Sequence, residues 1–180
     1  LPYPPRVQIT ATMQFQACQF VFTSTRAGTE HSNNIRLGEV RFFDSNGDLL
    51  TGMISSTTNP GGTYSSSYPP SRTTDGYNGG CWSDSFGLPS TLQLAFWTPT
   101  TFAAYEFITG DTSCGTSHDP TAWQLLCKPE GSDQWGVVDQ RSSVLAPTER
   151  STTYGRFNVT LNSDPALPPP PPPVTPSPPA

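Results

Sequence analysis

Short runs in which apolar and polar side chains alternate constrain the fold of this chain more than any other sequence feature. A period of two residues is typical of strands with one buried face, whereas a helix repeats every 3.6 residues. In residues 13–25, MQFQACQFVFTST, the alternation places Cys18, Phe20 and Phe22 on one face. Further strand-like runs are IRLGEVRFFD (35–44), STLQLAFWT (90–98), TFAAYEFITG (101–110), TAWQLLCK (121–128), WGVVDQRS (135–142) and YGRFNVTLN (154–162).

Turn-forming residues between these runs predict where the chain reverses. Asn46-Gly47 joins two apolar runs in FFDSNGDLLTG as a hairpin, because this dipeptide favours positive φ, and KPEGSDQ with Gly131 predicts a second hairpin. Residues 55–80 have many turn formers and no apolar stripe, which predicts a long irregular loop. The only helix candidate, SSVLAPTER, is interrupted by Pro147. We therefore expect an all-β, antiparallel jelly-roll sandwich of about eight strands, with no helix longer than two turns.

The chain ends in LPPPPPPVTPSPPA, residues 167–180. Proline fixes φ at about −65° and has no N–H, so this stretch fits neither a helix interior nor a central strand. An extended polyproline II rod remains, which rises about 3.1 Å per residue. We therefore divide the chain into an N-terminal extended segment at 1–9, a sandwich domain at 10–164 and a polyproline II tail at 165–180.

The charge of the chain excludes some classes of partner. The net charge is −5, and Lys128 is the only lysine among nine basic residues. No basic run is present to follow a phosphate backbone, so we expect no nucleic-acid binding. No apolar run approaches the roughly 18 residues of a membrane span, so we expect none.

The chain has four cysteines, none of them in a C-x-x-C pair: Cys18, Cys81, Cys114 and Cys127. This even, scattered set predicts two disulfides and an oxidising compartment. The alternative is four buried thiols in a cytosolic protein. Four cysteines allow three pairings. Because Cys114 and Cys127 are close in sequence, we favour Cys114–Cys127 with Cys18–Cys81.

One further observation is consistent with secretion. Asn158 begins the sequence N-V-T, an N-glycosylation sequon. No signal peptide is visible, so we expect the chain to begin after processing and to be extracellular.

Four stretches together carry a family resemblance: RLGEVRFFDSNGDLL, TTDGYNGGCWSD, LQLAFWTPTTFAAYEFITGD and HDPTAWQLLCKPEGSDQWGVVDQRS. They resemble the discoidin, or coagulation factor C-type, family, which has the galactose-binding-like fold. Cys127 and His118 depart from the glycine and arginine usual there. The resemblance covers about residues 10–161 and implies an eight-stranded jelly roll that binds carbohydrate, lipid or protein through loops at one end. The most specific matches are Asp119, Pro120, Trp123, Leu125, Gly131, Ser132, Asp133, Trp135, Val138 and Asp139.

The resemblance also implies a metal site, because the Asp-Gly stretch of related sandwiches often binds a structural Ca²⁺. Its ligands here are expected at Asp75 and Asn78, although Gly80 and Cys81 stand where the family has a threonine before the tryptophan. The alternative is that Asp75 caps its own turn. We expect no required cofactor. The stretch DSNGD at 44–48 starts like an EF-hand loop but lacks the later glycine and glutamate, so a solvated hairpin tip is expected.

Three tyrosines in the long polar loop are candidates for carbohydrate binding: Tyr64, Tyr68 and Tyr77. An exposed tyrosine presents an apolar plane and a hydrogen-bonding tip to a sugar. The alternative is that these rings anchor the loop onto the sandwich. The tryptophans at strand-linked positions are expected in the core: Trp82, Trp123 and Trp135.

The motifs favour a protein that is not an enzyme, since the chain has no G-x-S-x-G, H-E-x-x-H or phosphate-binding loop. A sandwich followed by a proline run resembles the extracellular hydroxyproline-rich glycoproteins of green algae and plants, whose tail prolines are hydroxylated and carry O-linked sugars. That resemblance implies modification at Pro168, Pro169, Pro170, Pro171, Pro172, Pro173, Thr175, Pro176, Ser177, Pro178 and Pro179.

The leading hypothesis is a structural extracellular glycoprotein. It would assemble with itself or with other matrix glycoproteins into a cell wall, matrix or filament. One alternative is a lectin-like module that binds glycans, with the tail holding it away from a surface. Another is a non-catalytic domain appended to a secreted enzyme.

Overall fold

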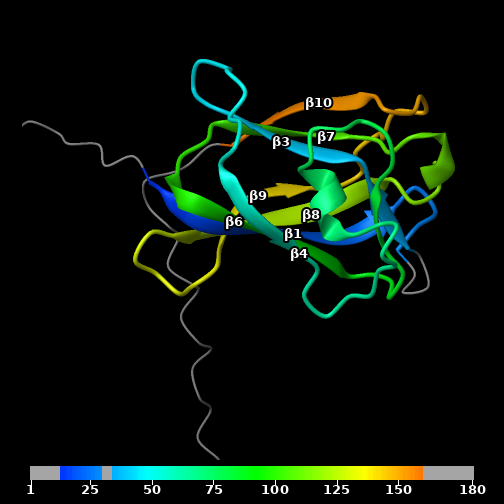
Figure 1. The fold of residues 1–180 in the computed structure, drawn as a ribbon, viewed down its shortest axis with the longest axis horizontal. Helices are drawn as coiled ribbons and strands as arrows, with labels where there is room; N and C mark the ends of the chain where they lie inside the picture. Colours follow the sequence, from blue (N-terminus) through cyan, green and yellow to red (C-terminus); the bar gives the residue numbers. More distant parts are fainter. Residues whose placement is uncertain (1–12, 30–33, 160–180) are drawn as a thin grey trace, which may run out of the picture.

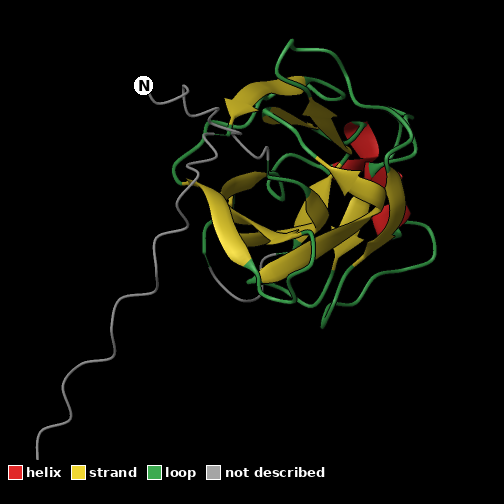
Figure 2. Ribbon diagram, turned by 90° about the vertical axis from the view of Figure 1, so that its left-hand side faces the viewer, coloured by secondary structure: helices red, strands yellow, loops and turns green. Residues whose placement is uncertain are grey.

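Ten strands and two short 3-10 helices make up the computed structural model, which describes residues 13–29 and 34–159. A five-stranded sheet has the order β4-β6-β1-β8-β9, a three-stranded sheet the order β10-β7-β3, and β2 pairs with β5. All pairs are antiparallel. Figure 1 shows β10, β7 and β3 as a layer above β9, β8 and β1, and Figure 2 shows the short helices to one side of the strands. The predicted all-β sandwich is confirmed.

Most elements follow the predicted runs, but the run at 35–44 forms two strands in different sheets, and β4 and β5 lie outside the predicted runs. The bounds of the elements are β1 Phe15–Thr25, β2 Ile35–Leu37, β3 Glu39–Phe43, β4 Ile54–Thr58, η1 Pro70–Thr73, β5 Trp82–Asp84, β6 Ser90–Thr100, β7 Ala104–Ile108, η2 Thr112–Cys114, β8 Pro120–Pro129, β9 Gly136–Arg141 and β10 Thr153–Asn158.

β1 is the central strand of the larger sheet. Phe20, in its middle, lies opposite Leu92 of β6 on one side and Leu125 of β8 on the other. Cys18, Phe20 and Phe22 are fully buried, as the alternation predicts. Because successive side chains of a strand point to opposite faces, this row faces the three-stranded sheet.

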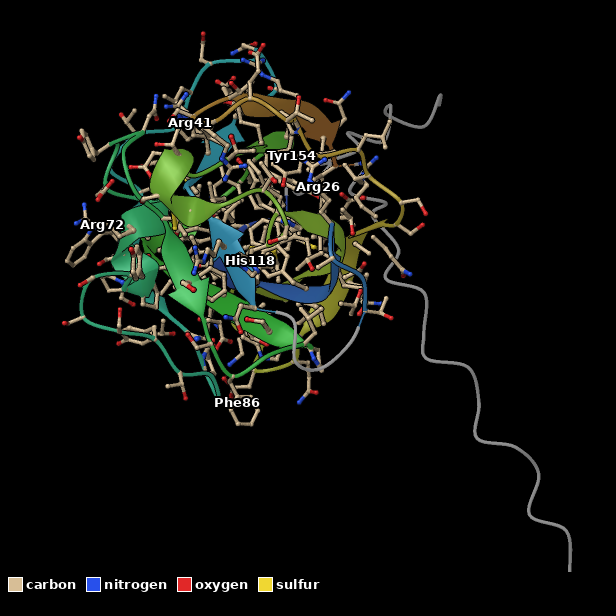
Figure 3. The ribbon with its side chains drawn as sticks, turned by 90° about the vertical axis from the view of Figure 1, so that its right-hand side faces the viewer. Arg26, Arg41, Arg72, Phe86, His118 and Tyr154 are labelled. Carbon is tan, nitrogen blue, oxygen red and sulfur yellow. A yellow bond between two sulfur atoms is a disulfide. The ribbon has the colours of Figure 1, made fainter. Side chains whose placement is uncertain are left out.

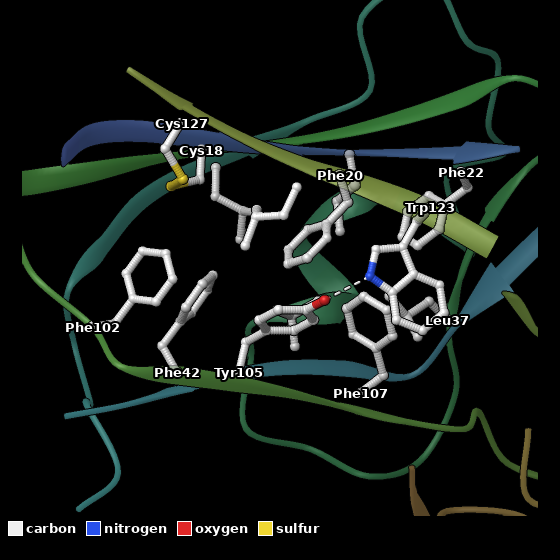
Figure 4. Packing of buried hydrophobic residues seen from close by; sticks show 14 of the residues in the cluster. Cys18, Phe20, Phe22, Leu37, Phe42, Phe102, Tyr105, Phe107, Trp123 and Cys127 are labelled. Carbon is white, nitrogen blue, oxygen red and sulfur yellow. Dashed lines mark hydrogen bonds between the residues drawn. A yellow bond between two sulfur atoms is a disulfide. The ribbon is translucent and has the colours of Figure 1, made fainter. Parts of the chain in front are cut away.

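Aromatic rings fill the space between the two sheets (Figure 4). The Phe20 ring of β1 lies 5.1 Å from the Tyr105 ring and 5.0 Å from the Phe107 ring, both on β7. At one end of this core, the Phe42 ring of β3 lies 4.8 Å from the Phe102 ring. Tilted and edge-on pairs at such spacings add about 0.5–1.5 kcal/mol each to the burial of apolar area.

One polar chain crosses this apolar core. The Trp123 indole N–H donates to the Tyr105 hydroxyl at 2.7 Å, and that hydroxyl donates to the Asp139 carboxylate at 2.6 Å. Burial, helped by the Asp139 carboxylate, raises the pKa of Tyr105 above its usual range. Asp139 also accepts from the Arg141 guanidinium at 2.8 Å. The chain thus links β8, β7 and β9 and satisfies the polar atoms of two buried side chains.

The four cysteines form two disulfides, as predicted, but the expected pairing is wrong. Cys18 pairs with Cys127 and Cys81 with Cys114. Cys18 and Cys127 lie directly opposite each other on β1 and β8, with their Cα atoms 4.0 Å apart. Sequence distance misled the prediction because sheet order, not proximity in the chain, decides which strands become neighbours.

The prediction of a long irregular loop at residues 55–80 is wrong in part. Residues 54–58 form β4, which pairs with β6 at the edge of the larger sheet, and residues 70–73 form η1. β4 lacks an apolar stripe because its side chains are only half-buried or exposed. The sandwich also has ten strands instead of about eight.

The predicted hairpins have different outcomes. Gly47 has a φ of 87°, as the Asn46-Gly47 turn requires. The two segments beside this turn are joined by an isolated β-bridge between Phe43 and Leu49, not by a ladder of paired strands. Gly131 has a φ of 74° in the connection between β8 and β9, so that hairpin is confirmed. The segment at 142–150 forms no helix. The predicted segments at 1–9 and 165–180 lie outside the described residues.

We expect Tyr105→Phe to lower the free energy of unfolding by about 1–3 kcal/mol, because it leaves the buried Trp123 N–H without its acceptor. Asp139 keeps its bond to Arg141, which limits the loss. Guanidinium denaturation followed by tryptophan fluorescence measures the change. Tyr64→Phe is the matched control, since this tyrosine is 46% exposed and should change stability by less than about 0.5 kcal/mol. Equal effects of the two variants would contradict the role of the polar chain.

Candidate functional site

A cavity of about 240 Å³ lies beside β3. Its walls come from three segments: β3 itself, the connection that leads into β4, and the loop that follows η1. The lining is partly apolar and carries two carboxyl groups and one guanidinium. It comprises Glu39, Val40, Arg41, Phe42, Leu49, Leu50, Thr51, Gly52, Met53, Ile54, Thr74, Asp75 and Gly76.

Glu39 is the most unusual residue of this cavity. Val40 and Phe42 of β3 join the core, so the alternation places Glu39 and Arg41 on the outer face of the three-stranded sheet. An outward glutamate is normally solvated, yet Glu39 is only 2% exposed. Its Oε1 atom has no hydrogen-bond partner. A buried carboxyl oxygen without a partner is rare in folded proteins and calls for an explanation.

The loop after η1 covers Glu39 and brings a second carboxyl group against it. Burial raises the pKa of Glu39 to about 7, and the contact with the Asp75 carboxyl adds to the shift. The Arg41 guanidinium and the Gly76 N–H oppose it. Asp75 is itself partly exposed, with an ion pair to Arg72 at 3.7 Å. A proton on Glu39, which is held below about pH 7, therefore removes the repulsion between the two carboxyl groups.

The expected calcium ligands have different surroundings. Asp75 lies on the cavity and accepts a hydrogen bond from the Tyr77 N–H at 2.9 Å, which is the turn cap considered as the alternative. The Asn78 amide oxygen instead accepts from the Arg41 guanidinium at 3.1 Å. The carboxyl group beside Asp75 is that of Glu39, which the sequence did not indicate. Among the described residues, no group of three or more His, Cys, Asp or Glu side chains is placed to hold a metal.

The three candidate sugar-binding tyrosines also differ in their surroundings. Tyr68 is half-buried, and the Arg36 guanidinium lies 5.9 Å from its ring centre, so it anchors the loop. Tyr77 is 64% exposed on the loop that covers β3. Tyr64 is 46% exposed, and Phe86, a residue that the sequence analysis did not single out, is 57% exposed. Figure 3 shows the Phe86 side chain projecting from the surface.

Asp84, at the end of β5, holds the segments that carry Tyr64 and Phe86. Its buried carboxylate accepts from the Thr63 and Phe86 N–H groups at 3.0 and 2.9 Å. The Ser90 hydroxyl donates to the other carboxylate oxygen at 2.6 Å. Two exposed aromatic rings therefore stand on segments that share one buried anchor.

The remaining candidate residues have simple roles. Trp82 and Trp123 are buried as expected, whereas Trp135 is half-buried and lies under the Lys128 ammonium at 5.1 Å. The Asp44 carboxylate accepts from the Asn46 and Asp48 N–H groups, which is the hairpin tip that was expected. Asn158 is exposed at the end of β10. The tail residues 168–179 lie outside the described residues.

One buried ion cluster is structural. Asp119 is fully buried and pairs with Arg150 at 2.6 Å and with Arg26 at 3.4 Å. Arg26 also donates to the carbonyls of Ala146 and Pro147 at 2.8 and 2.9 Å. The cluster therefore fastens the segment between β9 and β10 onto the sandwich.

Sequence signals for the missed residues were weak. Glu39 stands at an ordinary outward position of a strand, and only the covering loop makes it unusual. Phe86 gave a better signal of exposure, because it is a large apolar residue in SDSFGLPS, a segment without the alternating pattern of a strand.

Comparison with protein-family models, with curated protein sequences and with solved structures returned no match to this chain. The resemblances to discoidin domains and to hydroxyproline-rich glycoproteins therefore stay predictions. No helix in the described part of the chain is long and apolar enough to cross a membrane.

We expect Glu39 to make the metal-free protein less stable as the pH rises. Its folded pKa of about 7 lies above the ordinary 4.5, so its contribution is complete below about pH 4.5 and is lost as the pH rises through 7. The loss amounts to at most about 3 kcal/mol. Denaturant unfolding at several pH values, with a chelator present, measures it.

Glu39→Gln removes this titration and keeps the shape of the side chain. The variant should lose less stability than the wild type between pH 5 and pH 8. These two pH values lie below and above the folded pKa of Glu39, which is about 7. Asp48→Asn, at the exposed hairpin tip, is the control with the same change of charge. Parallel pH profiles for the wild type and Glu39→Gln would show that Glu39 is ionised throughout.

Proposed function

We propose that the protein is a structural glycoprotein of an extracellular wall, matrix or filament. In this proposal the sandwich is the folded module, and the proline-rich tail is a glycosylated rod. The observation that carries the proposal is the pair of disulfides. One joins the neighbouring strands β1 and β8 and the other joins the segments before β5 and after β7. Disulfides in such a domain are typical of proteins that function in an oxidising compartment.

The surface of the sandwich supports this proposal. Asn158 of the sequon is exposed, so an N-linked glycan would not disturb the core. β9 is an edge strand of the larger sheet, and Val137 on it is 57% exposed. Edge strands and exposed apolar side chains are the features through which neighbouring copies pack. Proline has no N–H for a strand ladder, so contacts of the tail would be packing and sugar-mediated bonds.

The exposed aromatic pair favours a second candidate, a lectin-like module. Tyr64 and Phe86 stand on segments that the Asp84 carboxylate holds together. Rigidly placed aromatic rings stack on the apolar faces of sugars with little loss of side-chain entropy. In this alternative the sandwich binds a glycan of the matrix and the tail is a spacer.

We expect deletion of residues 165–180 to leave the sandwich folded and to weaken assembly of the native glycoprotein. The tail lies outside the alternating runs whose side chains form the core, so we expect the sandwich to fold without it. Near-ultraviolet circular dichroism tests the fold, and sedimentation with electron microscopy tests assembly. Assembly equal to that of the full chain, or native tail prolines that carry no hydroxyl or sugar by mass spectrometry, would contradict the structural role.

The second candidate gives a separate result. If the sandwich is a lectin, Tyr64→Ala and Phe86→Ala should each weaken binding to a glycan array roughly tenfold, since a lost stacking contact is worth about 1 kcal/mol or more. Tyr77→Ala is the control, because this ring is also exposed, at 64%, and lies on another loop. Absence of any glycan signal for the full chain would remove the lectin candidate and leave the structural one.

A further inference from the structure

We propose that the proline run of one copy, residues 168–173, docks on the outer face of the larger sheet of a neighbouring copy, between Trp97 and Trp135. The two tryptophans lie on either side of small side chains at one end of this face. The inference rests on the proposed structural role, because it names the surface through which the tail would join one copy to the next.

Trp97 has the largest exposed fraction of any aromatic side chain in the described part of the chain, 72%. It follows Phe96 on β6, and the Phe96 side chain packs in the core. Because successive side chains of a strand point to opposite faces, Trp97 lies on the outer face of the larger sheet. Aromatic rings that stay exposed are enriched where proteins bind their partners.

A second tryptophan lies across the sheet from Trp97. Trp135 is half-buried in the connection between β8 and β9, and the Lys128 ammonium lies 5.1 Å from its ring centre. Lys128 follows Cys127, which belongs to the core, so Lys128 and the ring beneath it lie on the outer face. β6 and β8 are separated only by β1, which places them two strand spacings, or about 10 Å, apart.

The strands between the two tryptophans present an almost uncharged surface. Across β6, β1 and β8, one row on the outer face is Ala95, Ala17 and Lys128, and the next is Gln93, Gln19 and Leu126. The outer face of the three-stranded sheet instead carries charges of both signs, at Glu39, Arg41, Glu106 and Arg156. Residues 167–180 contain no charged side chain, so the face of the larger sheet is the one that suits them.

The spacing of the tryptophans also fits a proline rod. A polyproline II helix has three residues per turn and rises about 3.1 Å per residue, so the rings on one of its sides recur about every 9 Å. Aromatic side chains bind such rods by stacking on the rings, and the rod is extended before it binds. Its carbonyls remain free to accept hydrogen bonds, and the Lys128 ammonium and the Gln19 and Gln93 amides are donors on this face.

The described chain ends at the same end of the sandwich as the two tryptophans. The Val159 N–H donates to the Ala103 carbonyl at 2.9 Å, and the adjacent Phe102 ring lies 5.6 Å from the ring of Phe15. Phe15 is the first residue of β1, where β1 meets the last residues of β6 and β8. The tail therefore begins beside the proposed docking face.

The direction of β10 favours a neighbouring copy over the chain's own sandwich. β10 runs toward the start of β7, so the backbone points out of the sandwich at Val159. The proline run begins nine residues later, a distance of up to about 30 Å in an extended chain. Proline runs are stiff over several residues, so we expect the rod to meet the face of another copy.

The test is the self-association of the full chain, measured by sedimentation velocity over a range of concentrations. Trp97→Ala should weaken association roughly fivefold to tenfold, because it removes one aromatic stacking contact. Tyr77→Ala should leave it unchanged, since this ring is 64% exposed but lies on the loop that covers β3. Near-ultraviolet circular dichroism checks that both variants are folded.

A synthetic peptide of residues 165–180 tests the docking directly. It should compete with association of the full chain and shift the tryptophan emission to shorter wavelength, because docking covers the exposed Trp97 ring. The shift should be much smaller in Trp97→Ala. A peptide with alanine in place of the six prolines at 168–173 should neither compete nor shift the emission, since it lacks the rings that stack.

The outcomes separate this inference from the proposed function. If deletion of residues 165–180 weakens association and Trp97→Ala does not, the tail acts at another surface, so the docking face is wrong while the structural role stands. A full chain that is monomeric at every concentration would overturn docking between copies. Loss of binding to a glycan array in Trp97→Ala, with association unchanged, would also overturn it and assign the face to a free glycan.

Discussion

The position of β1 between β6 and β8 is the constraint on which the rest of this fold depends. Its buried row must meet β7 and β3 across the core, and the Phe20 ring lies against two rings of β7. The same pairing places Cys18 opposite Cys127, so one disulfide is a direct consequence of sheet order. A slip of one residue would turn the aromatic row toward solvent, which fixes the register strongly.

Period-two alternation predicted most strands because burial on one face leaves a clear pattern in the sequence. It failed for residues 54–58, since β4 is an edge strand with serine and threonine side chains that are half-buried or exposed. The disulfide pairing failed for another reason. It depends on which strands become neighbours, and that contact between distant segments has no local signal.

The candidate site was only half predictable. Asp75 was found because aspartate and glycine in a polar loop suggest an ion or a turn. Glu39 was missed because the loop after η1, a distant segment, buries its side chain. The sequence pattern within β3 does not indicate that this loop covers the strand. Residues that become unusual through tertiary contacts, such as Glu39 and Asp84, are the ones that local reasoning passes over.

The covering loop is held in place at its far end, and this explains how a carboxyl contact persists there. Cys81 joins it to Cys114, the Gly80 N–H donates to the Asp111 carboxylate at 2.9 Å, and the Ser151 hydroxyl donates to the Asn78 carbonyl at 2.8 Å. Such anchors restrict the conformations that the loop can adopt. The second disulfide therefore supports the site as well as the fold, because it keeps Asp75 within reach of Glu39.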